Sequence, residues 1–243
     1  MYKRQGRSVP NEISFISLRT NKKPFNSLQI RQAIAKSLNR ELISKKVSYG
    51  LRVPTRSIVP AKFKKNLLVS WPSYNIEEAK KILKKQGFCN GNVLNFPLTY
   101  RSNVPTDKLI ALAWQQDVNS SMKDCISMEI NGVESTTIYK NLSEGIYEAV
   151  ILDWIGGYSD PHSYLKPLLS CKKSEMNICI EGQSVFSGSF WASEQVEKLF
   201  LESESKYGLE RLKKLIEIEQ IASKSIPYLS LIHISEPTRL SAI

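Results

Sequence analysis

The sequence predicts an α/β fold whose sheet contains parallel pairs. Short runs rich in strand formers, such as 12–19 (EISFISLR) and 147–152 (YEAVIL), alternate with segments whose apolar residues recur every three to five positions. Along the chain the expected order is strand, helix, strand, helix, strand, helix, strand. Such alternation is typical of a sheet in which helices connect parallel neighbours.

The first half of the chain begins with the strand at 12–19 and a turn. From Leu28 the apolar spacing predicts one helix that continues to Tyr49, with Gly50 as its stop. Residues 51–73 hold Pro54, Pro60 and Pro72 and are expected to form a long ordered loop.

A second helix is expected to begin after Asn75, in the stretch NIEEAKKILKKQG. The Asn75 side chain can accept hydrogen bonds from free backbone N–H groups, and Glu78 follows three residues later, as in a capping box. Gly87 is the expected C-terminal stop of this helix.

The second half continues the alternation. We expect strands at 93–101, 126–130, 147–152 and 226–232, and helices at 106–122, 136–142, 161–169, 191–204 and 207–224. In the helix at 106–122, the side chains expected to face the core are Leu109, Leu112, Ala113 and Val118.

The composition, 42% hydrophobic and 23% charged residues, is typical of an ordinary globular protein. At 243 residues the chain can bury one good core. The net charge of +11 permits an anionic partner. However, the lysines occur in pairs interleaved with glutamates, as on solvated helix faces, and no RNA- or DNA-binding motif accompanies them. We therefore expect no nucleic acid partner, and a basic nucleic-acid-binding protein is only a distant alternative. No apolar window is long enough to span a membrane, and MYKRQGRSVP has no apolar core of a signal peptide.

The four cysteines and two histidines lack the spacing of a metal site, so we expect no metal and no cofactor. Cys171 and Cys179 are eight positions apart in a loop-like stretch and could close a disulfide in an oxidising compartment; the alternative is two unpaired thiols. Cys89 and Cys125 are expected to be lone thiols.

The stretch DWIGGYSDPHSYL, residues 153–165, follows the apolar strand at 147–152. Gly156 and Gly157 free the backbone, and Asp160-Pro161 is typical of a helix start. Open α/β sheets commonly bind ligands in loops at the carboxyl ends of their strands. This aromatic-rich loop is therefore the first candidate for a ligand site.

Four segments, in order, resemble one family. They are FNSLQIRQAIAKSLNRELISKKVSYGLRVPTRSIVP (25–60), YNIEEAKKILKKQGF (74–88), the strand VLNFPLTYRSN with its following helix, and YEAVILDWIGGYSDPHSYL. Together they resemble the C-terminal lobe of the extracytoplasmic solute-binding proteins that serve oligopeptide, dipeptide and nickel ABC importers. The resemblance covers roughly residues 12–231.

The resemblance implies a lobe with a mixed sheet and helices on both faces, and a protein with two lobes that close on a ligand. It implies that 12–231 is an incomplete C-terminal lobe, and that 1–10 and 232–243 are non-native ends. It also implies a monomer outside the cytoplasm that captures a peptide or a similar small solute. That protein would deliver the solute to an ABC permease in the membrane. A non-peptide solute (a nickel complex, a sugar or an opine) and a sensor role are the alternatives.

By the same resemblance, the ligand-binding residues are Trp154, Ile155, Gly156, Gly157 and Tyr158. Each has a plainer interpretation: the indole could pack in the core, the glycines could serve only a turn, and Tyr158 could be a surface aromatic. In oligopeptide-binding relatives an acidic residue three positions after the tryptophan holds the α-ammonium of the peptide, whereas this chain has Gly157. That difference argues against recognition of a free N-terminus at this position.

Two neighbouring polar residues complete the candidate set. Asp153 is expected to form structural hydrogen bonds at a strand end. Arg101, at the end of its strand, could bind an anionic ligand group, or could be a solvated side chain. No nucleophile elbow, P-loop, HExxH or dinucleotide motif occurs, so we expect a binding protein and not an enzyme.

Overall fold

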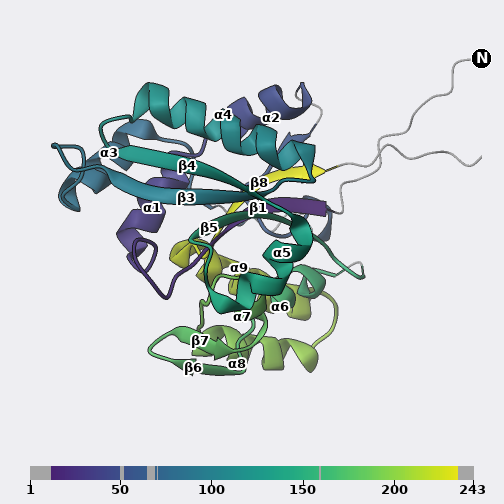
Figure 1. The fold of residues 1–243 in the computed structure, drawn as a ribbon. Coiled ribbons are helices and arrows are strands. Elements are labelled where there is room, and N and C mark those ends of the chain that lie inside the picture. The colour runs from purple at the N-terminus through teal and green to yellow at the C-terminus, as the bar shows by residue number, and fades with distance from the viewer. Residues whose placement is uncertain (1–11, 50–51, 65–68, 70, 159, 235–243) are drawn as a thin grey trace, which may run out of the picture.

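A six-stranded mixed sheet lies at the centre of the chain in the computed structural model, which describes residues 12–49, 52–64, 69, 71–158 and 160–234. The strand order is β2-β8-β1-β5-β3-β4, and the sheet runs through the middle of the molecule in Figure 1. β3 is parallel to β4 and β5, whereas β1 is antiparallel to β5 and β8, and β2 is antiparallel to β8. The bounds are β1 Glu12–Leu18, β2 Val53–Pro54, β3 Leu94–Arg101, β4 Ile126–Val133, β5 Ala149–Ile155 and β8 Tyr228–Ile234.

Four helices pack in one cluster against one face of the sheet: α1 Leu28–Lys36, α2 Arg40–Ser48, α3 Ile76–Lys85 and α4 Pro105–Ser121. In Figure 1, α2 and α4 lie above the strands, and α1 and α3 lie at the left. Their apolar stripes form one buried cluster with the strands, which includes Ile34, Leu83 and Trp114. The expected α3 helix is confirmed, and its cap is the expected one: the side chain of Asn75 accepts from the backbone N–H of Glu78 at 3.0 Å.

The opposite face carries the second half of the chain. It holds α5 Ser135–Asn141, α6 His162–Leu169, α7 Gln183–Phe186, α8 Glu194–Glu204 and α9 Gly208–Ser225, with short 3-10 helices at Ala61–Phe63 and Leu142–Glu144. A second buried cluster lies under these helices and includes Leu165, Phe200 and Leu215. The expected mixed sheet with helices on both faces is therefore confirmed.

The single helix expected from Leu28 to Tyr49 is two helices. The sequence Ser37-Leu38-Asn39 separates α1 from α2. The Ser37 hydroxyl donates back to the carbonyl of Ile34 at 2.8 Å, and the Asn39 side chain accepts from the backbone N–H of Leu42 at 3.0 Å. Both side chains satisfy backbone groups at the two helix ends, so the helix is interrupted here although the apolar spacing continues.

The buried face of α4 agrees with the expectation only in part: Ala113 and Val118 are buried as expected. Leu109 and Leu112 are 47% and 43% exposed, whereas Ile110, Ala111 and Trp114 take the inward positions. The indole N–H of Trp114 donates to the carbonyl of Ser37 at 3.3 Å, which fixes the rotation of the helix. Because the helix is apolar on more than one side, the spacing alone does not select the side that the sheet covers.

Two strands run further than expected. β5 continues through Asp153 and Trp154 to Ile155, all of which pair with β1. β8 continues to Ile234, three residues beyond the expected end of the lobe at 231, and Ile234 pairs with Glu12. Residues 1–11 and 235–243 lie outside the described residues.

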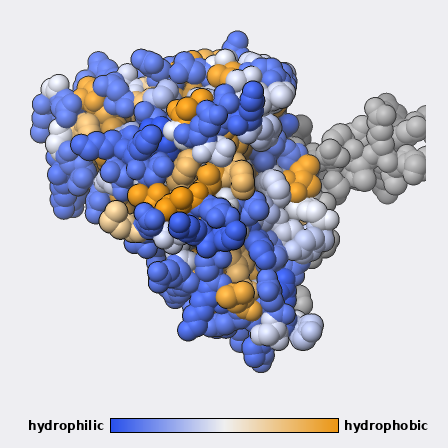
Figure 2. Space-filling view, turned by 60° about the horizontal axis from the view of Figure 1, so that its bottom comes forward, coloured by the Kyte–Doolittle hydropathy of each residue, from blue (hydrophilic) through white to orange (hydrophobic). Residues whose placement is uncertain are grey.

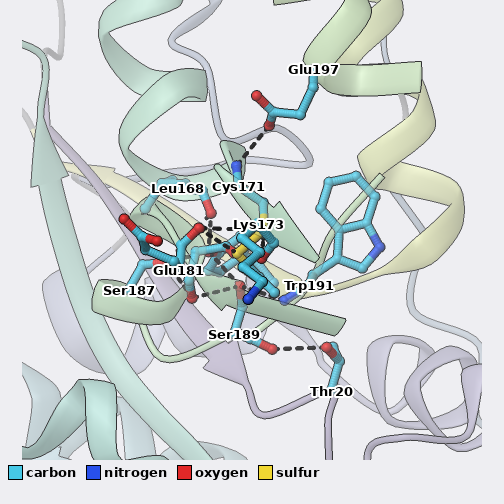
Figure 3. Close-up of a disulfide and its surroundings, with 12 residues drawn as sticks. Thr20, Leu168, Cys171, Lys173, Glu181, Ser187, Ser189, Trp191 and Glu197 are labelled. Carbon is cyan, nitrogen blue, oxygen red and sulfur yellow. Dashed lines mark hydrogen bonds between the residues drawn. A yellow bond between two sulfur atoms is a disulfide. The ribbon is translucent and has the colours of Figure 1, made fainter. Parts of the chain in front are cut away.

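The sequence interpretation missed a small hairpin, β6 Lys173–Glu175 and β7 Ile178–Glu181. A disulfide joins Cys171 to Cys179 at its base, as the spacing allowed. Figure 3 shows this bridge, with the Glu197 carboxylate accepting from the backbone N–H of Cys171 at 2.6 Å. The hairpin is thereby tied to α8.

A second disulfide joins Cys89 to Cys125, so the expectation of lone thiols at these positions is wrong. The two residues are 36 apart in sequence. They are brought together because Leu94 and Ile126 are partners in the parallel β3–β4 pair, which places the segments before both strands side by side. This register is a tertiary property that cysteine spacing does not reveal.

The long loop between α2 and α3 is held against α9 by Glu219, which is fully buried. Its carboxylate accepts from the backbone N–H of Ile58 at 3.0 Å and from the indole N–H of Trp71 at 3.3 Å. The ammonium of Lys64 lies 3.1 Å from the other carboxylate oxygen.

No helix among the described residues is both long and apolar enough to cross a membrane.

Candidate ligand-binding site

A buried ion-pair network lies at the carboxyl ends of β3 and β5. The guanidinium of Arg101 donates to Asp107 at the start of α4, with Nε 2.7 Å and Nη2 3.1 Å from the carboxylate oxygens. It also donates to both oxygens of Asp153 on β5, each at 2.7 Å, and to the hydroxyl of Tyr139 on α5 at 3.1 Å. One side chain thus links β3, β5, α4 and α5.

Arg101 has a partner for each of its five N–H groups within this network and is only 5% exposed. Burial lowers the pKa of its guanidinium, but the bonds and charges of Asp107 and Asp153 outweigh burial and raise the pKa above its ordinary value. The interpretation of Arg101 as a solvated side chain is wrong. Its N–H groups are all engaged within the network, which leaves no donor for an anionic ligand group.

Glu12 on β1 lies next to the Arg101 network. It pairs with Ile155 in the sheet register, so its side chain shares a face with Asp153. Burial, followed by the neighbouring Asp153 carboxylate, raises the pKa of Glu12 to about 7, while Arg52 and Arg101 act in the opposite direction. The carboxyl edge of the sheet therefore holds a group that titrates near neutral pH.

The loop after β5 is fixed to α6 at two points. The indole N–H of Trp154 donates to the carbonyl of Ser163 at 2.8 Å, and the half-buried ring packs against the second core cluster. At Gly156, an added Cβ would lie 2.3 Å from the hydroxyl oxygen of Ser163 and 2.5 Å from the Tyr164 ring. Gly156 is therefore required by the close approach of the loop to the helix, a reason that differs from the turn interpretation.

Asp160 starts the helix, as expected. Its carboxylate accepts from the backbone N–H of His162 at 2.8 Å and pairs with Arg211 of α9 at 3.2 Å. Asp160 thereby anchors the far end of the loop to two helices.

Between these anchors the loop presents an open surface. Ile155 is 57% exposed and Tyr158 is 54% exposed. Gly157 has no atom within 4 Å of the position that a Cβ would occupy. Of the five loop residues, Ile155, Gly157 and Tyr158 face open space, while Trp154 and Gly156 pack partly or wholly against the protein.

A hollow of about 420 Å³ lies beside this loop. Its lining includes Trp154, Gly157, Tyr158, His162, Lys166 and Gln183. The Nδ1 atom of His162 lies 2.6 Å from the hydroxyl of Tyr158, and its Nε2 is buried with no hydrogen-bond partner among the described residues. Burial, with the charges of Lys166 and Arg211, lowers the pKa of His162, which favours a neutral ring.

A larger hollow, about 750 Å³, lies between α1, α3 and α9. None of its lining residues belongs to the loop or to the Arg101 network, and its Lys36 is paired with Glu78 at 2.7 Å. We assign the site to the smaller hollow because the exposed aromatic loop and the carboxyl ends of the strands are there.

Sequence reasoning located the loop but missed Asp107, Tyr139 and His162. Asp107 and Tyr139 are on helices, and nothing in the local pattern separates them from surface polar residues. The position of Asp107 six residues after Arg101, across a strand-to-helix turn, is the one signal that could have suggested their pairing.

Among the described residues, no group of three or more His, Cys, Asp or Glu side chains could hold a metal ion.

Comparison with known proteins gives a consistent result. The family model described as bacterial extracellular solute-binding proteins, family 5 Middle, matches residues 2–176. The periplasmic oligopeptide-binding protein OppA of Salmonella typhimurium is 25% identical over 187 residues, which is 70% of this chain and 33% of the relative. The dipeptide-binding protein of Escherichia coli is 27% identical over 167 residues, 67% of this chain and 30% of the relative.

A solved structure with the same fold is Haemophilus influenzae OppA in complex with RPPGFSPFR. It superposes with a TM-score of 0.82 at 23% identity, over 95% of this chain and 44% of that one. The chain therefore spans less than half of the length of these relatives. The mixed sheet, its helical layers and the family match over most of the chain agree, and the chain belongs to the bacterial extracellular solute-binding proteins of family 5.

Proposed function

We propose that this chain forms the C-terminal lobe of a two-lobed substrate-binding protein of an ABC importer. The protein captures a peptide in the cleft between its lobes outside the cytoplasm and delivers it to a permease. The relatives named for oligopeptide and dipeptide binding support this proposal. The two disulfides fit an oxidising compartment.

The single observation that carries the proposal is the exposed loop at the carboxyl edge of the sheet, beside a hollow of about 420 Å³. Ile155 and Tyr158 offer apolar surface, and Gly157 leaves the backbone accessible. Such a surface suits an extended peptide, whose main chain can be held without regard to its side chains. The Arg101 network holds the strand ends rigid behind the loop, which lowers the entropy lost on binding.

Binding then acts through closure and involves no bond breaking. The ligand contacts the loop from one side and the second lobe from the other, so the closed form is favoured by contacts that the open form lacks. Only the closed form is expected to dock on the permease.

Gly157 bears on which end group of the ligand the protein recognises. The resemblance places an acidic residue at this position in relatives that hold a peptide α-ammonium, and here the space is empty. We therefore infer that the peptide's N-terminal ammonium is not a main recognition element. A non-peptide solute is the second candidate, supported by the same observation.

The proposal is tested on the two-lobed protein purified without refolding. Native mass spectrometry should show co-purified masses of short peptides, and calorimetry should show binding by the two-lobed protein. A single non-peptide mass would replace the peptide by another solute. Tight peptide binding by residues 12–234 alone would contradict a site shared between two lobes.

Gly157→Asp tests the ligand's end group. The open space accepts the side chain, and its carboxylate should favour peptides with a free N-terminus over N-acetylated peptides by roughly 10-fold, through a charge-assisted hydrogen bond. The unsubstituted protein should bind both forms about equally. Gly156→Ala is the contrasting variant: it should lower the melting temperature, because its Cβ would overlap Ser163 and Tyr164. A strong preference for free N-termini in the unsubstituted protein would contradict the inference.

A further inference from the structure

The helices on the two faces of the sheet differ in net charge. Within their bounds, α1 to α4 hold 10 Lys and Arg but 5 Asp and Glu, whereas α5 to α9 hold seven of each sign. The helical layer formed by α1 to α4 is therefore the more basic one.

Within the basic layer, α2 and α4 lie next to each other along the top of Figure 1. The indole of Trp114, in the second half of α4, donates to the carbonyl of Ser37, just before α2 begins. Asn39 and Asp117 both lie close enough to the Tyr74 hydroxyl to affect its pKa, which again joins the start of α2 to the second half of α4. The helices are thus antiparallel, and the end of α2 lies beside the start of α4.

The exposed residues at the end of α2 and in the first half of α4 include three lysines and three apolar side chains, which together we call the α2–α4 ridge. Its members are Lys45, Lys46, Tyr49, Lys108, Leu109 and Leu112. Tyr49 is 95% exposed, and the two leucines are those that the sequence had placed in the core. Exposed apolar side chains that gather within a rim of polar residues mark an interaction surface.

The ridge lysines lack ion-pair partners among the described residues. The one carboxylate on their own helix face is Glu41, which is exposed and four residues before Lys45, and Asp107 beside Lys108 is turned inward to Arg101. On the opposite layer, Lys166, Lys172 and Lys214 are each paired with a glutamate. The ridge charge is therefore not neutralised locally.

We propose that the α2–α4 ridge docks on the surface of an anionic phospholipid bilayer. Lysines attract anionic headgroups, and Tyr49, Leu109 and Leu112 can enter the interfacial region, as on amphipathic helices that lie in a membrane surface. A nucleic acid backbone would match the lysines but would leave the apolar side chains without partners. The combination of both residue types on the ridge favours the bilayer.

Vesicle co-sedimentation tests this proposal with the chain itself. The protein should bind vesicles of phosphatidylcholine mixed with phosphatidylglycerol and should not bind vesicles of phosphatidylcholine alone. Binding should weaken between about 0.1 M and about 0.5 M salt because charges are screened. The triple variant K45Q/K46Q/K108Q should bind the mixed vesicles roughly 100-fold more weakly.

A charge-matched variant separates the ridge from net charge. K173Q/K198Q/K213Q removes three exposed lysines from the opposite layer and should retain binding within about 3-fold. Y49S/L109S/L112S should weaken binding while leaving the net charge intact. Circular dichroism and the melting temperature should be unchanged in all three variants. Equal losses in the two lysine variants, no binding to the mixed vesicles, or tighter binding to duplex DNA than to vesicles would overturn the proposal.

Discussion

The guanidinium of Arg101 joins β3, α4 and α5 to β5, the strand that leads into the candidate loop. Its position at the end of β3 was visible in the sequence, but its partners were not. Asp153 is 52 residues away and Tyr139 is 38 residues away. Buried charges are stable only when paired, so removal of one partner leaves the others uncompensated.

Arg101→Met should therefore lower the free energy of unfolding by about 3–5 kcal/mol, because two carboxylates lose their shared cation. Urea unfolding followed by circular dichroism measures this change. Lys206→Met is the control, since it removes an exposed i,i+4 pair with Glu210 and should cost less than about 0.5 kcal/mol. Equal effects of the two substitutions would show that the Arg101 network does not stabilise the fold.

Glu12 makes stability depend on pH. The pKa of its carboxyl is raised from 4.5 to about 7, so the folded state keeps a proton that the unfolded state has lost in this interval. Its contribution therefore falls as pH rises from about 4.5 to about 7 and is constant above that.

Glu12→Gln should remove this decline, so that the variant gains stability over the unsubstituted protein as pH rises, by about 1 kcal/mol at pH 8 after allowance for partial exposure. Melting temperatures of both proteins between pH 4.5 and 8 measure the difference. A difference that stays constant with pH would contradict the raised pKa.

Among the elements, α4 and the paired helices α1 and α2 show how local and tertiary signals differ. In each case the apolar spacing predicted a helix where the structure has helix. The spacing did not predict the break at Ser37–Asn39 or the outward position of Leu109 and Leu112 on α4. Caps and a single indole hydrogen bond decide both features. Figure 2 shows apolar side chains gathered across the middle of the face that it views. In the half of the chain that forms the other layer, exposed apolar residues include Ile146, Ile180 and Phe186.

The two disulfides should differ in their effect because they close loops of different length. Replacement of Cys89 and Cys125 by alanine should lower the free energy of unfolding by about 4 kcal/mol, and replacement of Cys171 and Cys179 by about 2.5 kcal/mol, from the entropy of the unfolded chain. Denaturant unfolding of both double variants measures the order. A larger loss for the shorter loop would show that local contacts of the hairpin outweigh chain entropy.

For the whole molecule, the central sheet couples two cores. One core lies under α1 to α4 and the other under α5, α6, α8 and α9, and strands β1 and β5 contribute side chains to both. The layers share a sheet but carry different net charge, so the fold can use them for different contacts.

We expect the two cores to unfold together. Ile34→Ala and Leu215→Ala each empty a fully buried position on opposite faces and should each lower the free energy of unfolding by about 2–5 kcal/mol. Both variants should still show a single transition in calorimetry, because the strands belong to both cores. Two separate transitions in either variant would show that the layers are independent.

The sequence by itself determined the alternation of strands and helices, the Asn75 cap and the position of the aromatic loop after β5, because these depend on neighbours within a few residues. Only the tertiary structure decided the Arg101 partners, the Cys89–Cys125 bridge and the outward position of Leu109 and Leu112. Each of these depends on which strands become neighbours and which helix face the sheet covers. Sheet register brings together residues tens of positions apart, and local periodicity carries no information about that choice.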